Sequence, residues 1–339
     1  MDKIYLIVLN WNRWKDTIEC LQSIYANDYN NYQVIVVDNN SSDNSIEYIK
    51  EWSEGKLKEF KLDKPIYYKE FIIRKDDKQL EYIEKNTDKT KGNNESNPLI
   101  LIQTRENLGY AGGNNIGIKY IMENEPNAYG LVLNNDTIIP KNFISNVIDI
   151  LLRNSGKNIS VMGFPAYKYD NPEEAEVIYV KENILKGPEK VTSIPKKFKG
   201  ELIKCKSVGG HAMLITPSSP IKLIPEHYFL YYEESDFCNQ IINNNGNIYV
   251  SLNTPVYHKH SGTVGLDSPI QLYYAGRNLL YYMKLYRNGV LFLLFLILKT
   301  SKTILNVMKY LLKRDLLHAK ALIRAYVDFF LGRRGKQWI

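Results

Sequence analysis

The stretch IYLIVLNWNRWKDTIECLQSIYANDYNNYQVIVVDNN, Ile4–Asn40, decides the fold of this chain. Its two ends, Ile4–Asn10 and Gln33–Asn40, are short apolar runs rich in β-branched residues, and each stops at Asn or Asp. Such runs are typical of strands buried on both faces, as in parallel sheets. One face of the segment between them carries Ile18, Leu21, Ile24 and Tyr25, which predicts a helix. The stretch therefore predicts the start of a right-handed βαβ unit.

The same alternation continues along the chain. Strands are predicted at Leu99–Asn107 and Tyr129–Asn134, separated by a glycine-rich turn that opens a helix. Further strands are predicted within residues 205–216 and 247–260, with a helix at 233–246 between them. Residues 54–98 are rich in Lys, Glu, Asp and Asn, and predict an insertion with a strand at 65–74 and a solvated loop at its end. The sequence thus predicts an α/β fold with a mostly parallel sheet and flanking helices.

Composition excludes several classes of protein. The chain has 339 residues, 44% of them hydrophobic and 24% charged, which suits one large globular domain or two ordinary ones. Three cysteines without metal-ligand spacing indicate a reducing compartment and no disulfide framework. The N-terminus lacks the features of a secretory signal, and the longest apolar run, Val290–Leu298, is too short to span a bilayer.

The net charge of +7 is unevenly distributed. Residues 299–339 contain ten Lys and Arg against Asp315 and Asp328, so this tail carries +8 and residues 1–298 carry about −1. The basic character belongs to the tail and the main domain is neutral. No nucleic-acid partner is therefore predicted.

Four predicted strands end in polar residues. Because the carboxyl ends of parallel strands meet at one edge of a sheet, these residues are expected to form a pocket. A nucleotide fits this pocket, with Asp38 accepting from a base N–H or a ribose hydroxyl. A plain turn would also satisfy the run at 134–136, since Asn and Asp bond their own backbone. The strand-end residues are Asn10 and Asn12, Asp38, Asn107 with Gly109, and Asn134, Asn135 and Asp136.

The turn NLGYAGGNN, Asn107–Asn115, opens the helix after the third strand. Backbone N–H groups at a helix N-terminus favour an anionic phosphate. Gly109, Gly113 and Asn114 are the candidate contacts of this turn. A Rossmann dinucleotide site is disfavoured, because the glycines lack the G-x-G-x-x-G spacing and the first strand leads into NWNR.

Eight motifs, in this order along the chain, resemble those of family-2 glycosyltransferases, and most closely the rhamnosyl- and galactofuranosyl-type enzymes of surface-polysaccharide synthesis. The resemblance covers about residues 3–285, except for the insertion. It implies a GT-A (Rossmann-like) fold, a nucleotide-diphosphate sugar donor such as a UDP- or dTDP-sugar, a divalent metal and inversion at the anomeric carbon. The motifs are VLNWNR, VVDNNSSDNS, RENLGYAGGNNIGI, LNNDT, VGGHAMLI, YFLYYEESDFC, HKHSGTVG and GRNLLYY.

The resemblance places a metal site at Asn134-Asn135-Asp136, where the family has an Asp-x-Asp motif. Asn134 replaces the first Asp, so Asp136 becomes the main carboxylate for Mg²⁺ or Mn²⁺. One carboxylate is chemically sufficient for Mg²⁺ when phosphates and water complete its shell. His258 matches the family histidine that completes the metal site, although this histidine and its neighbour His260 also fit an ordinary surface loop.

A cluster of acids, Glu233, Glu234 and Asp236, follows the aromatic run YFLYY. Displacement of a nucleoside diphosphate requires a base that takes the proton of the acceptor hydroxyl. The family's base aligns with Glu234, where most members carry Asp. Asp236 is the second candidate for a catalytic role. An acidic first helical turn, stabilised by the helix dipole, would also account for the cluster.

Two further positions come from the resemblance. Gly210, in VGGHAMLI, matches a turn that borders the donor sugar, and a tight strand bend is compatible with this role. Arg277, in YYAGRNLLYY, is predicted to reach a phosphate or an anionic acceptor, with a solvated position on an amphipathic helix as the alternative.

The tail, residues 286–339, predicts a pair of basic amphipathic helices. Polar residues recur at helical spacing from Lys302 to Asp328, and apolar residues lie opposite them. This pattern predicts reversible docking at the cytoplasmic face of the membrane, where a lipid-linked acceptor would be carried. The alternative is a helical hairpin that packs on the catalytic domain or on a second subunit of a homo-oligomer.

The sequence therefore predicts a GT-A catalytic domain at 1–285, with the insertion 54–98, and the helical tail. Two rivals stay open. A nucleotidyltransferase on a related sheet would carry a basic phosphate-binding loop near its N-terminus, and VLNWNRWKD is not one. A non-catalytic nucleotide-sugar-binding module is favoured only by the replacement of the first Asp at Asn134.

Overall fold

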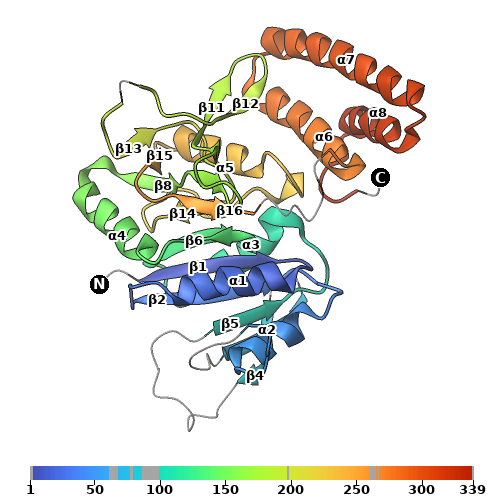
Figure 1. Cartoon of the computed structure of the whole chain (residues 1–339). Coiled ribbons are helices and arrows are strands. Elements are labelled where there is room, and N and C mark those ends of the chain that lie inside the picture. Colours follow the sequence, from blue (N-terminus) through green and yellow to red (C-terminus); the bar gives the residue numbers. More distant parts are fainter. Residues whose placement is uncertain are drawn as a thin grey trace.

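A ten-stranded sheet forms the centre of the computed structural model (Figure 1). The structure describes residues 3–60, 99–196, 198–259, 265 and 267–337, and the backbone of 68–76 and 79–85. The strand order is β13 (Leu202–Lys204), β15 (Asn247–Ser251), β8 (Ile159–Gly163), β14 (Ala212–Ile215), β6 (Tyr129–Asn134), β1 (Ile4–Asn10), β2 (Tyr32–Asp38), β5 (Leu99–Gln103), β3 (Tyr68–Asp76) and β4 (Gln79–Lys85).

The middle of the sheet is parallel, which confirms the predicted fold class. β1 pairs in parallel with β2 and β6, and β2 pairs in parallel with β5. β14 lies antiparallel between β6 and β8. In the insertion, β3 and β4 form an antiparallel pair that extends one edge of the sheet. The solvated loop predicted at the end of the insertion lies outside the described residues.

Helices cover both faces of the sheet, so the central strands are apolar throughout. Alternate residues of β1 point to opposite faces. Ile4, Leu6 and Val8 pack with α1 (Trp14–Tyr25), α2 (Ser45–Ser53) and α4 (Phe143–Arg153). Tyr5 and Ile7 pack with α3 (Gly109–Asn124) and α5 (Glu233–Asn243) on the other face.

A smaller four-stranded sheet lies beside the carboxyl ends of the main strands. Its order is β10 (Ala175–Val177), β9 (Ala166–Lys168), β16 (Val256–His258) and β7 (Thr137–Ile138). Because β7 follows Asp136 directly and β16 ends at His258, this sheet brings the two predicted metal ligands together. A separate hairpin, β11 (Tyr179–Asn183) and β12 (Gly187–Val191), follows β10.

Three helices end the chain: α6 (Pro269–Tyr286), α7 (Gly289–Leu312) and α8 (Leu316–Phe330). α6 packs against α8, and Figure 1 shows α7 along the outer side of this group. The predicted helical pair is confirmed in outline, but the apolar run at 290–298 joins the first amphipathic segment in one helix. The short helices η1 (Ser155–Lys157) and η2 (Glu226–Tyr228) complete the described elements.

α7 changes one expectation about membranes. Its 24 residues are, by length and composition alone, long and apolar enough to cross a bilayer, and it is the one such helix among the residues that the structure describes. The uninterrupted apolar run, Val290–Leu298, is too short to span a bilayer, but the helix continues beyond it through Lys299 and Lys302 to Leu312.

Candidate active site

The ends of β1 and β2 place Asn10 and Asp38 side by side, as the strand-end argument predicts. Both residues are fully buried. Asn10 Nδ2 donates to Asp38 Oδ1 at 2.7 Å, and Asn10 Oδ1 accepts from Thr17 Oγ1 at 2.6 Å. The backbone N–H of Ser41 donates to Asp38 Oδ2 at 3.1 Å. Asp38 is therefore held rigidly at the sheet edge, as a ligand-binding carboxylate needs to be.

Asn12 joins the loops that follow β1 and β2. Its backbone N–H donates to Ser41 Oγ at 2.7 Å, and its Oδ1 accepts from the N–H of Ser42 at 2.8 Å. Its φ of 53° is in the left-handed region, which Asn tolerates better than most residues. The structure thus gives Asn12 a positioning role between the two loops.

The glycine-rich turn packs tightly against the protein itself. Asn107 Oδ1 accepts from the N–H of Gly109 at 2.8 Å and from Asn39 Nδ2 at 3.0 Å. Gly109 has φ +73°, and a Cβ atom there would lie 2.2 Å from the carbonyl oxygen of Phe229. A Cβ on Gly113 would lie 2.3 Å from Leu9 Cδ1. Close packing therefore accounts for both glycines, and their predicted phosphate contacts stay predictions.

Asn114, the last candidate of this turn, is fully buried inside α3. Its Nδ2 donates to the carbonyl of Tyr110 at 3.0 Å, whereas no residue that the structure describes donates a hydrogen bond to its Oδ1. A buried acceptor without a partner costs stability. Its predicted contact with the donor also stays a prediction.

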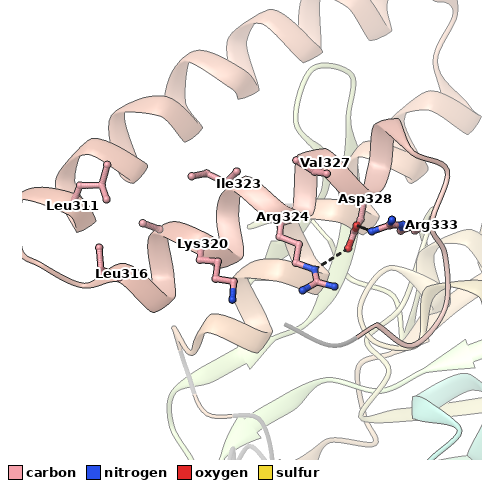
Figure 2. Close-up of a pocket in the computed structure, with 9 residues that line it drawn as sticks. Leu311, Leu316, Lys320, Ile323, Arg324, Val327, Asp328 and Arg333 are labelled. Carbon is pink, nitrogen blue, oxygen red and sulfur yellow. Dashed lines mark hydrogen bonds and ion pairs between the residues drawn. The ribbon is translucent and has the colours of Figure 1, made fainter.

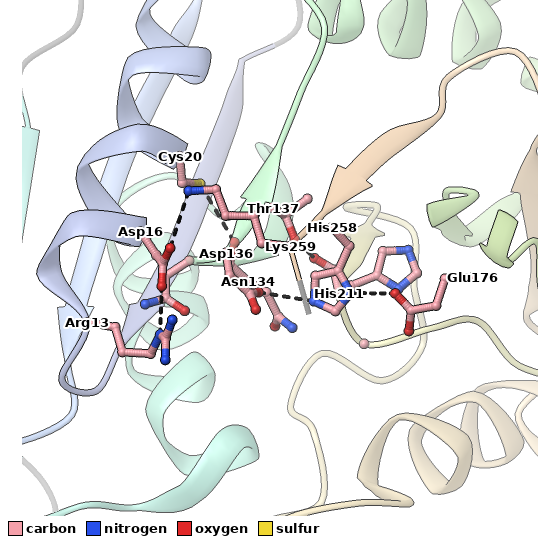
Figure 3. A network of polar contacts seen from close by, with 12 residues as sticks. Arg13, Asp16, Cys20, Asn134, Asp136, Thr137, Glu176, His211, His258 and Lys259 are labelled. Carbon is pink, nitrogen blue, oxygen red and sulfur yellow. Dashed lines mark hydrogen bonds and ion pairs between the residues drawn. The ribbon is translucent and has the colours of Figure 1, made fainter. Parts of the chain in front are cut away.

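The Asn-Asn-Asp run connects β6 to β7 (Figure 3). The N–H of Asn134 donates to the carbonyl of His211 at 2.9 Å. Asn135 Nδ2 donates to Thr17 Oγ1 at 3.0 Å, so Thr17 links this run to Asn10. Asp136 is only 8% exposed. These contacts place the run at the same sheet edge as Asp38.

His258 lies between two carboxylates (Figure 3). Its Nε2 is 3.1 Å from Asp136 Oδ1, and its Nδ1 is 2.7 Å from Glu176 Oε2. Although burial lowers the pKa of His258, the hydrogen bonds and charges of Asp136 and Glu176 raise it to about 9. Burial alone would raise the pKa of Glu176, but His258 and Lys190 hold it well below its usual range.

Asp136 and His258 fit one divalent cation. Two ligand atoms about 3 Å apart can share an ion at metal–ligand distances of about 2.1 Å. The hydrogen bond from Nδ1 to Glu176 keeps Nε2 toward Asp136, as in carboxylate–histidine–metal arrangements. No group of three or more His, Cys, Asp and Glu suited to a metal exists among the described residues, so the donor's phosphates would have to complete the shell.

The three acids at the start of α5 differ in their burial and in their hydrogen-bond partners. Glu233 is 3% exposed, and its Oε2 has no hydrogen-bond partner among the described residues. Asp236 is fully buried, with Oδ1 accepting from Gln240 Nε2 at 3.0 Å and from the hydroxyl of Tyr286. Glu234 is partly exposed, and burial raises its pKa. Of the two catalytic candidates, Glu234 is therefore the carboxylate that the structure leaves available to a substrate.

Lys190 of β12 interacts with two of the carboxylates described above. Its Nζ donates to Glu176 Oε1 at 2.8 Å. Its positive charge also lowers the pKa of Glu234, against the larger effect of burial.

Comparison with known proteins shows similarity to glycosyltransferases. Residues 5–69 match the model of glycosyl transferase family 2. The low-salt glycan biosynthesis hexosyltransferase Agl10 of Haloferax volcanii is 26% identical over 191 residues, which are 53% of this chain and 58% of that protein. The match thus spans little more than half of this relative.

Residues 5–69 are therefore the part of this chain that is similar to glycosyl transferase family 2.

Solved structures show that its fold is GT-A. The mannosyltransferase PcManGT from Pyrobaculum calidifontis, in complex with GDP-Man and Mn²⁺, has a TM-score of 0.54 at 12% identity, over 98% of this chain and 88% of its own. Residues 1–349 of S. aureus TarS have a TM-score of 0.52 at 14% identity, over 98% of this chain and 81% of theirs.

Two of the predicted site residues have contacts that the sequence did not indicate. Arg277 is fully buried, and its Nη2 donates to the carbonyl of Tyr228 at 3.0 Å. Its burial excludes the predicted alternative, in which Arg277 is solvated on an amphipathic helix. A contact with a phosphate would require Arg277 to break its hydrogen bonds within the protein. Gly210 lies against Tyr110, whose hydroxyl donates to the Gly210 carbonyl at 2.5 Å.

Five residues of the candidate site were not predicted from the sequence, namely Thr17, Tyr110, Glu176, Lys190 and His211. Glu176 and Lys190 lie on short strands without a motif, so no signal in one sequence points to them. Tyr110 and His211 lie inside motifs that were quoted for other residues, and Thr17 lies in the helix predicted after the first strand. Burial, followed by the positive charge of His258, lowers the pKa of His211 to about 4, so His211 is neutral at pH 7.

Proposed function

We propose that this chain is a metal-dependent, inverting glycosyltransferase, which moves a sugar from a UDP- or dTDP-sugar to a glycan acceptor. The observation that carries the proposal is the pair of Asp136 and His258, whose Oδ1 and Nε2 atoms lie 3.1 Å apart where β6 and β16 end. The complexes of GDP-Man and Mn²⁺ with the Pyrobaculum mannosyltransferase support a nucleotide-sugar donor and a metal.

The donor is bound along the sheet edge. Asp38, fixed by Asn10, accepts from the ribose or the base, and Asp136 with His258 binds at the diphosphate. Mg²⁺ or Mn²⁺, when bound to these two residues, supplies positive charge that stabilises the leaving diphosphate. The other proposed donor contacts are Asn12, Asn107, Gly109, Gly113, Asn114, Asn134, Asn135 and Gly210.

Glu234 is the proposed general base. Its carboxylate takes the proton of the acceptor hydroxyl while the oxygen attacks the anomeric carbon opposite the diphosphate, which inverts the configuration. Such proton transfer contributes about 10²–10⁴-fold to a rate. The raised pKa of Glu234 makes its carboxylate a stronger base than a solvated one. Asp236, the other acid of the prediction, is buried and orients α5 through Tyr286.

The acceptor is proposed to be lipid-linked, as in surface polysaccharide or glycoprotein glycan synthesis, with the protein peripheral to the cytoplasmic face of the membrane. Of 23 exposed large hydrophobic residues in the described chain, 16 lie between Val290 and Leu331. Such a concentration is typical of a surface that contacts a membrane or a partner. Figure 2 shows part of it, a groove of about 400 Å³ on α8, where Leu316, Ile323 and Val327 lie beside Lys320 and Arg324.

A comparison of Glu234→Gln with the wild-type protein tests this function. We expect transfer from the active donor to fall by about 100-fold or more, while nucleotide affinity stays within about twofold. Glu174→Gln, at an exposed carboxylate, is the matched control and should keep full activity.

Three outcomes would contradict the proposal or favour one of the two alternative functions. Full turnover by Glu234→Gln would reject Glu234 as the base. A wild-type protein that binds nucleotide sugars but neither transfers nor hydrolyses them, with acceptor glycan and Mn²⁺ present, would be a binding module. Release of pyrophosphate from a nucleoside triphosphate and a sugar phosphate would identify a nucleotidyltransferase.

A further inference from the structure

The segment that precedes the proposed base has an unusual backbone. Phe229, Tyr231 and Tyr232 have φ angles of 71°, 69° and 75°, in the left-handed region that side chains other than glycine rarely adopt. Glu233 and Glu234 follow at once and begin α5. Backbone of this kind persists only where its surroundings hold it, and it concentrates at functional sites.

Asn278 of α6 is bonded to this segment. Its Nδ2 lies 2.9 Å from the carbonyl oxygen of Tyr228, 2.6 Å from that of Leu230 and 3.3 Å from that of Tyr231. The residue is fully buried. Its Oδ1 accepts from Arg277 Nε at 2.9 Å, which fixes the orientation of the amide. Both N–H groups of the amide therefore point to carbonyls of the left-handed segment.

Arg277 completes the contact. Its Nη2 donates to the Tyr228 carbonyl at 3.0 Å, and its Nη1 donates to the hydroxyl of Tyr273 at 3.2 Å. The rings of Tyr273 and Tyr274 lie 5.2 Å and 5.0 Å from the guanidinium carbon. The Tyr273 hydroxyl in turn donates to Asp328 of α8 at 2.6 Å. The guanidinium is thus held on several sides.

We propose that Arg277 and Asn278 are positioning residues that hold the left-handed segment 228–232 and thereby place the carboxylate of Glu234. This rests on the proposed function of Glu234. The backbone N–H of Asp236 donates to the Tyr232 carbonyl at 2.9 Å, so the first turn of α5 moves with the segment. The arrangement also gives the GRN part of the GRNLLYY motif a physical role.

Asn278→Asp is the sharpest test. It keeps the size of the side chain and turns its two donors into an acceptor that repels the three carbonyls. We expect kcat to fall by at least about tenfold, since a misplaced base loses part of its 10²–10⁴-fold contribution. Nucleotide affinity should stay within about twofold, because Asn278 itself bonds only to Arg277 and to carbonyls of residues 228–231, none of them among the donor contacts named above.

Hydrogen exchange gives a second readout that needs no activity. The amides of residues 229–236 should exchange faster in Asn278→Asp than in the wild type, because the segment loses its anchoring hydrogen bonds. Asn154→Asp is the matched control: Asn154 Nδ2 donates to the Ile150 carbonyl at 2.9 Å, on α4, and its loss should leave both kcat and the exchange of 229–236 unchanged. Arg277→Lys, which keeps the buried charge but loses the planar fork, should give an intermediate effect if Asn278→Asp does not fold.

Wild-type exchange of residues 229–236 in the folded variants would overturn the proposal, whether or not the protein transfers sugar. A fall in kcat that is equalled by Asn154→Asp would also overturn it, since the effect would then be general destabilisation. Failure of the proposed function is separate: the wild type would transfer no sugar, while the change in exchange would still be present.

Discussion

Glu176 orients the imidazole of His258 through a single hydrogen bond of 2.7 Å, and its side chain is 11% exposed. Carboxylates that orient a metal-binding histidine typically contribute 10–100-fold to metal affinity. Glu176 has no motif around it, whereas Asp136 and His258 lie in motifs that a single sequence can show. The proposed ligands could therefore be named from the sequence, whereas Glu176, which orients His258, required the structure.

Glu176→Gln is expected to weaken Mn²⁺ binding in the presence of UDP by about 10–100-fold. An amide cannot hold the ring as strongly as a carboxylate, so Nε2 would be less well aimed at the ion. Titration calorimetry measures the change directly. Glu174→Gln is the control, since Glu174 is exposed and pairs with Lys168. Equal Mn²⁺ affinity in the two variants would contradict the role of Glu176.

Glu233 makes a testable contribution to stability. Burial, then the charge of Glu234, raises its pKa well above the ordinary value of about 4.5. The unfolded chain therefore releases this proton at lower pH than the folded chain does. Stability falls as pH rises from about 4.5 toward the folded pKa, and it is unaffected below 4.5.

Glu233→Gln is thus expected to raise the melting temperature at pH 7–8 by a few degrees, and to leave it unchanged near pH 4. Scanning calorimetry across this range tests the expectation. An equal shift at both pH values would indicate an effect of packing, and a lower melting temperature at pH 8 would show that the ionised carboxylate is stabilised in the folded protein.

At the scale of elements, the strands covered by helices on both faces could be predicted well. β1 and β6 end at Asn10 and Asn134, as the sequence indicates, because continuous apolar runs leave little ambiguity. The second sheet could not be predicted, since β9, β10 and β16 have three residues each and β7 has two. Strands of two or three residues are too short to show a hydrophobic periodicity in the sequence. They can be recognised only from the strands with which they pair.

The glycine-rich turn shows a second limit of prediction from the sequence. Its sequence favours a phosphate site, yet Gly109 is required by the carbonyl of Phe229 and Gly113 by the side chain of Leu9. Close packing between elements that are distant in the sequence requires glycine at these two positions, and a bound phosphate would require the same residue type. Glycine in such a turn therefore predicts a close approach, and the structure decides what approaches.

At the scale of the whole molecule, the exposed apolar surface of α7 and α8 predicts binding to anionic membranes. Each Lys or Arg near an anionic leaflet contributes about 1 kcal/mol. The double variant Lys313→Glu, Lys320→Glu should therefore reduce partitioning into phosphatidylglycerol vesicles by roughly 30-fold or more. Flotation or sedimentation with vesicles measures it, with phosphatidylcholine vesicles as the reference.

The matched control is Lys196→Glu, Lys199→Glu, at two exposed lysines of the catalytic domain, which should bind as the wild type does. Equal loss in both double variants would show a general charge effect and no docking by the tail. A protein that ignores vesicles but forms stable dimers would support the alternative, in which this surface packs on a second subunit.

α6 also has a consequence for building chimaeric enzymes. The predicted boundary at residue 285 falls near the end of this helix, whose Asn278 bonds to the segment before the base and whose Tyr273 bonds to Asp328 of α8. A hybrid that exchanges the last helices of two relatives at residue 285 would join one parent's α6 to the other parent's α8. The productive crossover point lies before Pro269, so that α6, α7 and α8 are inherited together.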